Sequence, residues 1–103
     1  MKNWLNQDLA VGDYVVTHFD RGSTYVGEIA ALKLDRNGAP KARIISRFHT
    51  SGTDSKVWED TEWHRQPDGQ YIQTTPNTKV GGWMYVWKAT KIDKATFDNV
   101  VPV

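Results

Sequence analysis

The sequence predicts a single all-β domain of 103 residues. β-branched and aromatic residues recur in short alternating runs, and turn residues separate these runs along the whole chain. No long segment shows the spacing of three and four apolar residues that an amphipathic helix requires. With 39% hydrophobic and 24% charged residues, the composition is that of a folded globular protein. We therefore expect one domain over residues 1–103, built from about six antiparallel strands.

The strongest local pattern is a hairpin around Asn37-Gly38, which is typical of a two-residue type I′ turn between twisted strands. The flanking strands would be 25–34 and 41–49, with Leu34 opposite Lys41. In that register one face is nearly all apolar, and we expect it to be the core side. Its members are Tyr25, Ile29, Ala31, Ala42, Ile44 and Phe48.

The remaining elements are placed by turn residues and alternation. A first strand is expected over 9–17, interrupted at Gly12-Asp13, and a loop over 18–23. Residues 57–65 and 70–75 flank Pro67-Asp68-Gly69 and predict a second hairpin. A long strand over 82–92 and one helical turn over 93–98 complete the prediction.

The segment from Leu9 to Ile29 resembles the opening hairpin of SH3-like small barrels, particularly Tudor and KOW domains. The residues that carry the resemblance are Gly12-Asp13 at the first strand, Gly22 in the loop, and 25–29 in the second strand. The resemblance implies an SH3-like or related small β-barrel. A Tudor-like chain would use Phe19 and Tyr25 in an aromatic cage for a methylated cation, whereas a KOW-like chain would bind nucleic acid. The tryptophan-rich acidic segment 57–65 departs from both patterns.

Aromatic residues are the one compositional excess, with five Trp, four Tyr and three Phe. Trp58 and Trp63 would lie on opposite faces of one strand, so they cannot both enter one core. We therefore expect a protein–protein interaction module, a small cytoplasmic accessory or inhibitor protein of the bacterial or phage type. Its protein partner, or a second copy in a homodimer, would contact exposed aromatic anchors. The candidates are Trp58, Trp63, Trp83, Tyr85 and Trp87.

Nucleic-acid binding is the alternative function. In the predicted register four basic side chains share one strand face, and such a row could follow a phosphate backbone. They are Lys41, Arg43, Arg47 and His49. The aromatic row at 83, 85 and 87 could add base stacking. A solvated face with alternating charges explains the same pattern, because Glu28 would lie opposite Arg47.

Catalysis and metal binding find little support in the sequence. Asp60 and Glu62 would share a face with His64 and could suggest paired carboxylates for glycoside hydrolysis, but a solvated acidic strand edge is the favoured interpretation. The spacing of His18, His49 and His64 matches no ligand pattern, and the chain has no cysteine. We expect no enzyme activity, no cofactor and no metal.

The composition of the first nine residues and of the whole chain also bears on location. The start is polar, and no apolar run approaches the ~20 residues of a membrane span. We expect a cytoplasmic protein that does not associate with membranes.

Overall fold

The computed structural model describes residues 1–18, 22–50, 56–60, 62–74 and 80–102. The all-β class is confirmed, since this part of the chain holds eight strands and one short helix. In chain order the elements are β1 (Tyr14–His18), β2 (Thr24–Leu34), β3 (Pro40–Thr50), β4 (Val57–Glu59), β5 (Glu62–Arg65), β6 (Tyr71–Thr74), β7 (Val80–Tyr85), the 3-10 turn η1 (Val86–Lys88), β8 (Ala89–Ile92) and α1 (Lys94–Asp98).

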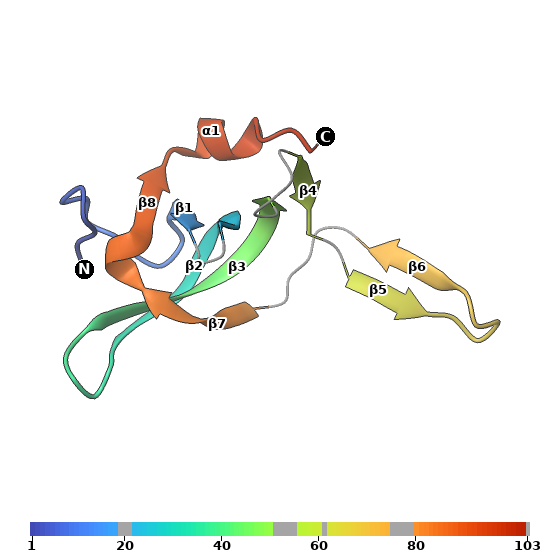
Figure 1. Ribbon diagram of the computed structural model, residues 1–103, viewed down its shortest axis with the longest axis horizontal. Coiled ribbons are helices and arrows are strands. Elements are labelled where there is room, and N and C mark those ends of the chain that lie inside the picture. The colour runs from blue at the N-terminus through green and yellow to red at the C-terminus, as the bar shows by residue number, and fades with distance from the viewer. Residues whose placement is uncertain (19–21, 51–55, 61, 75–79, 103) are drawn as a thin grey trace.

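Two sheets form, and all their pairs are antiparallel. The main sheet has the order β4-β3-β2-β1-β8, and β7 pairs with the other half of the free side of β3. β5 and β6 form a separate two-stranded sheet, which projects to the right in Figure 1. The β2–β3 hairpin projects at the lower left (Figure 1). The pairs recorded for the described strands leave the main sheet open, so a closed barrel is not established.

Three of the predicted strands have different bounds. β1 begins only at Tyr14, because Gly12 has φ 94° and the Asp13 N–H donates to the Ala10 carbonyl in a turn. The predicted strand 57–65 is two strands, of which β4 pairs with β3 and β5 with β6. The predicted strand 82–92 is broken by η1, after which β8 turns to pair with β1.

The β2–β3 hairpin is confirmed, but its turn and register differ from the prediction. Gly38 has φ 81°, whereas Asn37 does not adopt a positive φ, so the turn is not type I′. The Asp35 carboxylate accepts the N–H groups of Asn37 and Ala39, each at 2.8 Å. These hydrogen bonds stabilise a longer loop, and Leu34 consequently lies opposite Pro40 instead of Lys41.

Two register shifts decide which side chains of this hairpin reach the core. One shift skips Ala30 of β2 and brings Ile29 opposite Ile44, and both are buried. The other skips Arg47 of β3 and places Phe48 opposite Val26. Val26 and Ile29 are three residues apart on β2 and therefore point to opposite faces of the sheet. Phe48, opposite Val26, thus lies on the other face from Ile44, which is opposite Ile29. The core prediction is thus correct for Ile29, Ala42 and Ile44.

The sheet is packed on both faces. The main core contains Leu9, Val15, Ile29, Ala42, Ile44, Met84, Val86 and Ala89. On the opposite face α1 covers Phe48, as its buried Phe97 stacks on Tyr14 with centroids 4.3 Å apart and meets the Phe48 ring edge-on at 6.1 Å. Tyr25 and Ala31, also predicted for the core, are only half-buried.

The predicted helical turn after residue 93 is α1. Asp93 is its N-cap and accepts the Thr96 N–H at 2.7 Å. Hydrogen bonds from Thr96 lower the pKa of Asp93, because they stabilise its charged form. No helix in the described ranges has the length and apolar character needed to cross a lipid bilayer.

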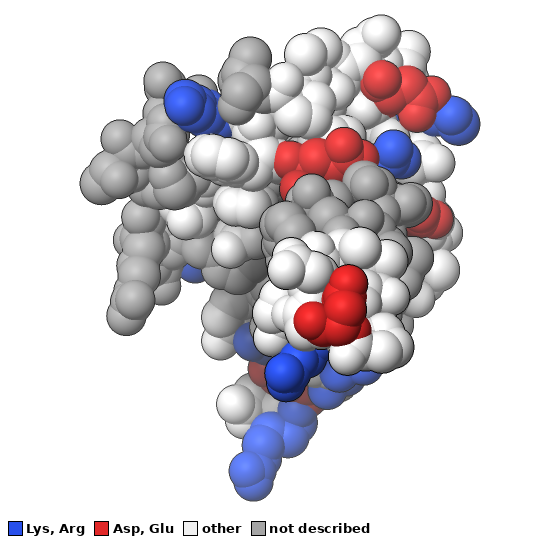
Figure 2. Space-filling model, turned by 90° about the vertical axis from the view of Figure 1, so that its right-hand side faces the viewer, with Lys and Arg blue, Asp and Glu red and all other residues white. Residues whose placement is uncertain are grey.

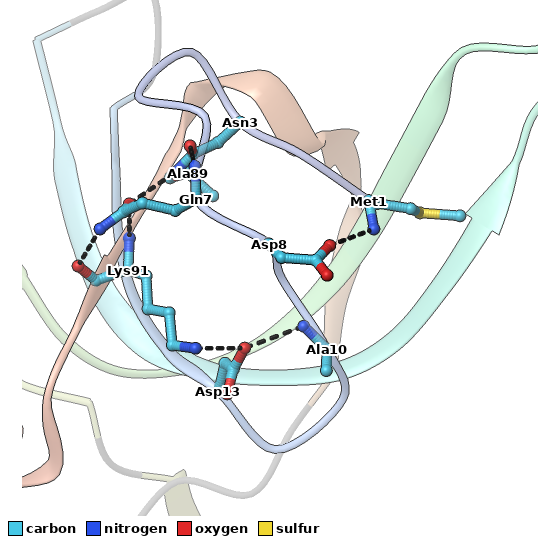
Figure 3. Close-up of polar contacts among 8 residues, drawn as sticks. All are labelled: Met1, Asn3, Gln7, Asp8, Ala10, Asp13, Ala89 and Lys91. Atoms are coloured by element: carbon cyan, nitrogen blue, oxygen red, sulfur yellow. Dashed lines mark hydrogen bonds and ion pairs between the residues drawn. The ribbon is translucent and has the colours of Figure 1, made fainter.

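The N-terminal segment is held against β8 by side-chain hydrogen bonds (Figure 3). The Asn3 amide donates to the Ala89 carbonyl at 2.7 Å, and the Gln7 side chain bonds the backbone of Lys91. The Lys91 ammonium in turn pairs with Asp13 at 3.3 Å. These contacts fix residues 1–13 beside the last strand although the segment forms no regular strand of its own.

Candidate functional site

Alternation along β7 separates a core side from an outward side. Met84 is buried at 8% exposure, and Val86, the first residue of η1, is fully buried. Trp83 is half-buried and Tyr85 is 44% exposed. Because Met84 and Val86 are buried, Trp83 and Tyr85 lie on the outward side of β7.

Basic side chains of the neighbouring strands lie against these two rings. In the register of the sheet Lys41 is opposite Tyr85 and Arg43 is opposite Trp83. The Lys41 Nζ atom lies 3.3 Å from the centre of the Tyr85 ring. The Arg43 Cζ atom lies 4.7 Å, and the Lys33 Nζ atom 4.2 Å, from the Trp83 ring. We call Lys33, Lys41, Arg43, Trp83 and Tyr85 the basic aromatic face.

None of the ion pairs within the described ranges includes Lys33, Lys41 or Arg43. These ion pairs therefore do not neutralise the charge of the basic aromatic face. In the turn of the hairpin, the Asp35 carboxylate accepts the N–H groups of Asn37 and Ala39. Cation–π contacts hold the three cations in place while leaving their charge available to an anion. Figure 2 shows Lys and Arg gathered towards the lower end of the molecule, the end at which the hairpin projects in Figure 1.

The other two residues of the predicted basic row are placed elsewhere. Arg47 falls at the register shift of β3, packs over the Phe48 and Phe97 rings, and pairs with Glu59 at 3.7 Å. The His49 Nδ1 atom lies 2.6 Å from the Asp60 carboxylate. The predicted row of four is therefore divided, because the acidic residues that follow β3 in the chain engage its second half.

Ser46, His49 and Asp60 come together without forming a catalytic triad. The Ser46 hydroxyl donates to one Asp60 oxygen, and the His49 ring contacts the other. A triad requires the histidine between hydroxyl and carboxylate, where it can accept the proton of the nucleophile. Here the carboxylate is central, so the cluster ties β4 to β3 instead. Among the described residues no three His, Cys, Asp or Glu side chains are grouped as metal ligands.

The five predicted partner-binding aromatics do not form one patch. Trp83 and Tyr85 lie together on β7, whereas Trp58 lies on β4 opposite His49 and is 44% exposed. Trp63 belongs to the separate sheet of β5 and β6. Trp87, 57% exposed, leaves the strand row because it lies in η1.

Two contributions were missed by the sequence reasoning. Trp4 is 60% exposed, and its backbone N–H donates to the Trp87 carbonyl, although the two residues are far apart in the chain. Lys33 joins the basic aromatic face only because the turn is one residue longer than predicted, which pairs Lys33 with Lys41. The Asp35 carboxylate before Asn37-Gly38 was the available sequence signal for that longer turn.

A pocket of about 260 Å³ adjoins the basic aromatic face. Among the described residues, its lining includes Thr17, Tyr25, Ile44, Ser46, Gly82, Trp83 and Met84. Tyr25, one of the two residues implied for an aromatic cage, is stacked on His49 with centroids 5.9 Å apart. Phe19, the other, lies outside the described residues.

Comparison of the chain with protein-family models, with curated proteins and with solved structures gives no match.

Proposed function

We propose that this protein is a non-enzymatic module that binds single-stranded nucleic acid on its basic aromatic face. One observation carries the proposal: Lys33, Lys41 and Arg43, from two strands, converge on the aromatic rings of β7. None of these three side chains takes part in an ion pair within the described ranges. Cations of this kind supply the salt-dependent contacts to phosphate, and aromatic rings stack on unpaired bases of any sequence.

The alternative of double-stranded DNA is less well supported. The groove of a duplex hides the base faces, so Trp83 and Tyr85 would have no stacking partner there. The net charge of +1 is also too small for attraction by the protein as a whole, so binding must depend on this local arrangement.

An SH3-like small barrel is our proposal for the finer description of the fold. Its support is the strand order β8-β1-β2-β3-β7, with the 3-10 turn η1 between β7 and β8, which resembles the order in SH3-like domains. In this description β4, β5 and β6 form an insertion between the third and fourth strands of the barrel. The KOW-like opening hairpin agrees with a nucleic-acid ligand.

The test is fluorescence anisotropy with labelled single-stranded RNA, single-stranded DNA and duplex DNA over a range of salt. The double variant Lys41→Gln, Arg43→Gln should weaken single-strand binding and reduce the slope of log K against log salt by about 0.7 for each phosphate that the variant no longer neutralises. Lys56→Gln is the control for loss of a lysine over a tryptophan ring, because the Lys56 Nζ atom lies over the ring of Trp58, which belongs to β4. Undetectable binding of all three nucleic acids at low salt would reject the proposal.

A protein partner is the second candidate, favoured by the exposed surface at Trp4 and Trp87. The backbone N–H of Trp4 donates to the Trp87 carbonyl, and the adjacent residue Leu5 is 47% exposed. A cytoplasmic accessory or inhibitor protein of bacterial or phage type would use such anchors, and Trp87→Ala should then cost ~2 kcal/mol or more of affinity. Capture of protein partners that survives nuclease treatment and is abolished in Trp87→Ala would favour this candidate. The mass in solution tests the homodimer.

A further inference from the structure

The pocket beside the basic aromatic face has the size and lining of a site for one planar ring system. Its volume of about 260 Å³ lies just below the ~300–1,000 Å³ of clefts that take drug-sized ligands. Its lining includes the aromatic residues Tyr25 and Trp83 and the apolar residues Ile44 and Met84. Ser46 also belongs to the lining, while its hydroxyl donates to Asp60.

The pocket and the basic aromatic face share a residue, which argues for a shared ligand. Trp83 lines the pocket and also lies under the cations Lys33 and Arg43. A chain whose phosphates contact those cations would carry its bases past the pocket opening. A base has two flat apolar faces, which match the aromatic and apolar residues of this lining.

We propose that the pocket receives one unpaired nucleobase of a strand whose phosphates lie on the basic aromatic face. This inference rests on the proposed function and adds to it a defined base site, distinct from stacking on the open surface. Gly82 makes the site testable, because it lines the pocket and a Cβ added there would meet nothing within 4 Å. A larger side chain can therefore be placed at this lining position without a Cβ overlap, to narrow the pocket.

The experiment compares a thymidine pentamer with an abasic pentamer of the same charge, each binding to the full chain. The native protein should prefer the intact pentamer by about tenfold or more, the size of one stacking contact. Gly82→Ile should remove most of this preference while leaving the salt dependence unchanged, and the control Ala95→Ser, at an exposed position of α1 outside the pocket lining, should keep the preference. Urea unfolding of both variants verifies that they are folded.

A second measurement needs no variant. A pentamer with one 2-aminopurine base should be shielded from acrylamide quenching when bound, since a base in the pocket is enclosed. A preference that persists in folded Gly82→Ile, or full quenching of the bound base, would overturn the pocket site while the surface proposal stands. Equal affinity for both pentamers would overturn the pocket site together with base stacking on Trp83 and Tyr85. Failure of both pentamers, and of longer strands, to bind at low salt would overturn the proposed function itself.

Discussion

Gly27 shows how strongly a single residue can be constrained by the sheet around it. A Cβ atom built on Gly27 would overlap the backbone carbonyl of Ile45 and lie 2.8 Å from Cγ2 of Ile44. The register shift between Val26 and Gly27 brings the two strands this close. In the sequence Gly27 reads as an ordinary strand glycine, because the neighbour that excludes a side chain is 18 positions away.

Gly27→Ala should therefore lower the free energy of unfolding by ~1–3 kcal/mol, the usual cost of overpacking, since a backbone carbonyl cannot move aside as a flexible side chain can. Urea unfolding followed by tryptophan fluorescence measures this cost. Gly82→Ala is the matched control and should stay within ~0.5 kcal/mol of the native protein. Equal stabilities of the two variants would show that β2 and β3 do not approach so closely at Gly27.

At the scale of the element, the β2–β3 hairpin shows what its turn residues determine. Asn37-Gly38 correctly predicts a reversal, but the type of turn depends on hydrogen bonds that begin at Asp35. The longer loop and the skipped residue Ala30 each shift the register by one residue in the same direction, so together they shift it by two residues and leave the same side chains on the core face. Ile29 and Ile44 consequently still meet in the core, as the hydrophobic pattern predicted, although they are reached by a different pairing.

The two turn residues should respond differently to substitution. Gly38→Val should destabilise the protein by ~1–3 kcal/mol, because a β-branched residue is strained at positive φ. Asn37→Val should cost clearly less, since Asn37 does not have a positive φ. Thermal or urea unfolding of the two variants measures the free energy of unfolding that each substitution costs. A similar large destabilisation at both positions would indicate a type I′ turn, in which both residues have a positive φ.

At the scale of the whole molecule, the sheet is covered on both faces, which the sequence pattern did not predict. Phe48 was expected in the same core as Ile44, but it packs with Tyr14 and Phe97 under α1. The short C-terminal helix is thus part of the packed structure, and its single buried side chain is Phe97.

Phe97→Ala should cost ~3–5 kcal/mol in unfolding free energy, the range for removing a buried phenylalanine. Ala95→Ser, at an exposed position of the same helix, is the control and should change stability little. Urea unfolding compares the two variants, and a change below ~1 kcal/mol for Phe97→Ala would contradict the packing of α1 against the sheet.

The sequence by itself determined the all-β class, the reversal at Asn37-Gly38, and the alternation that separates Met84 from Trp83 and Tyr85. These features depend on residues close together in the chain. Only the tertiary structure decided which basic residues form ion pairs within the described ranges and which do not. β4 brings Glu59 and Asp60 to Arg47 and His49, whereas β7 brings aromatic rings to Lys41 and Arg43. The physical reason is that β3 has different partner strands along its two halves, and a strand's own sequence does not specify which distant strand will pair with it.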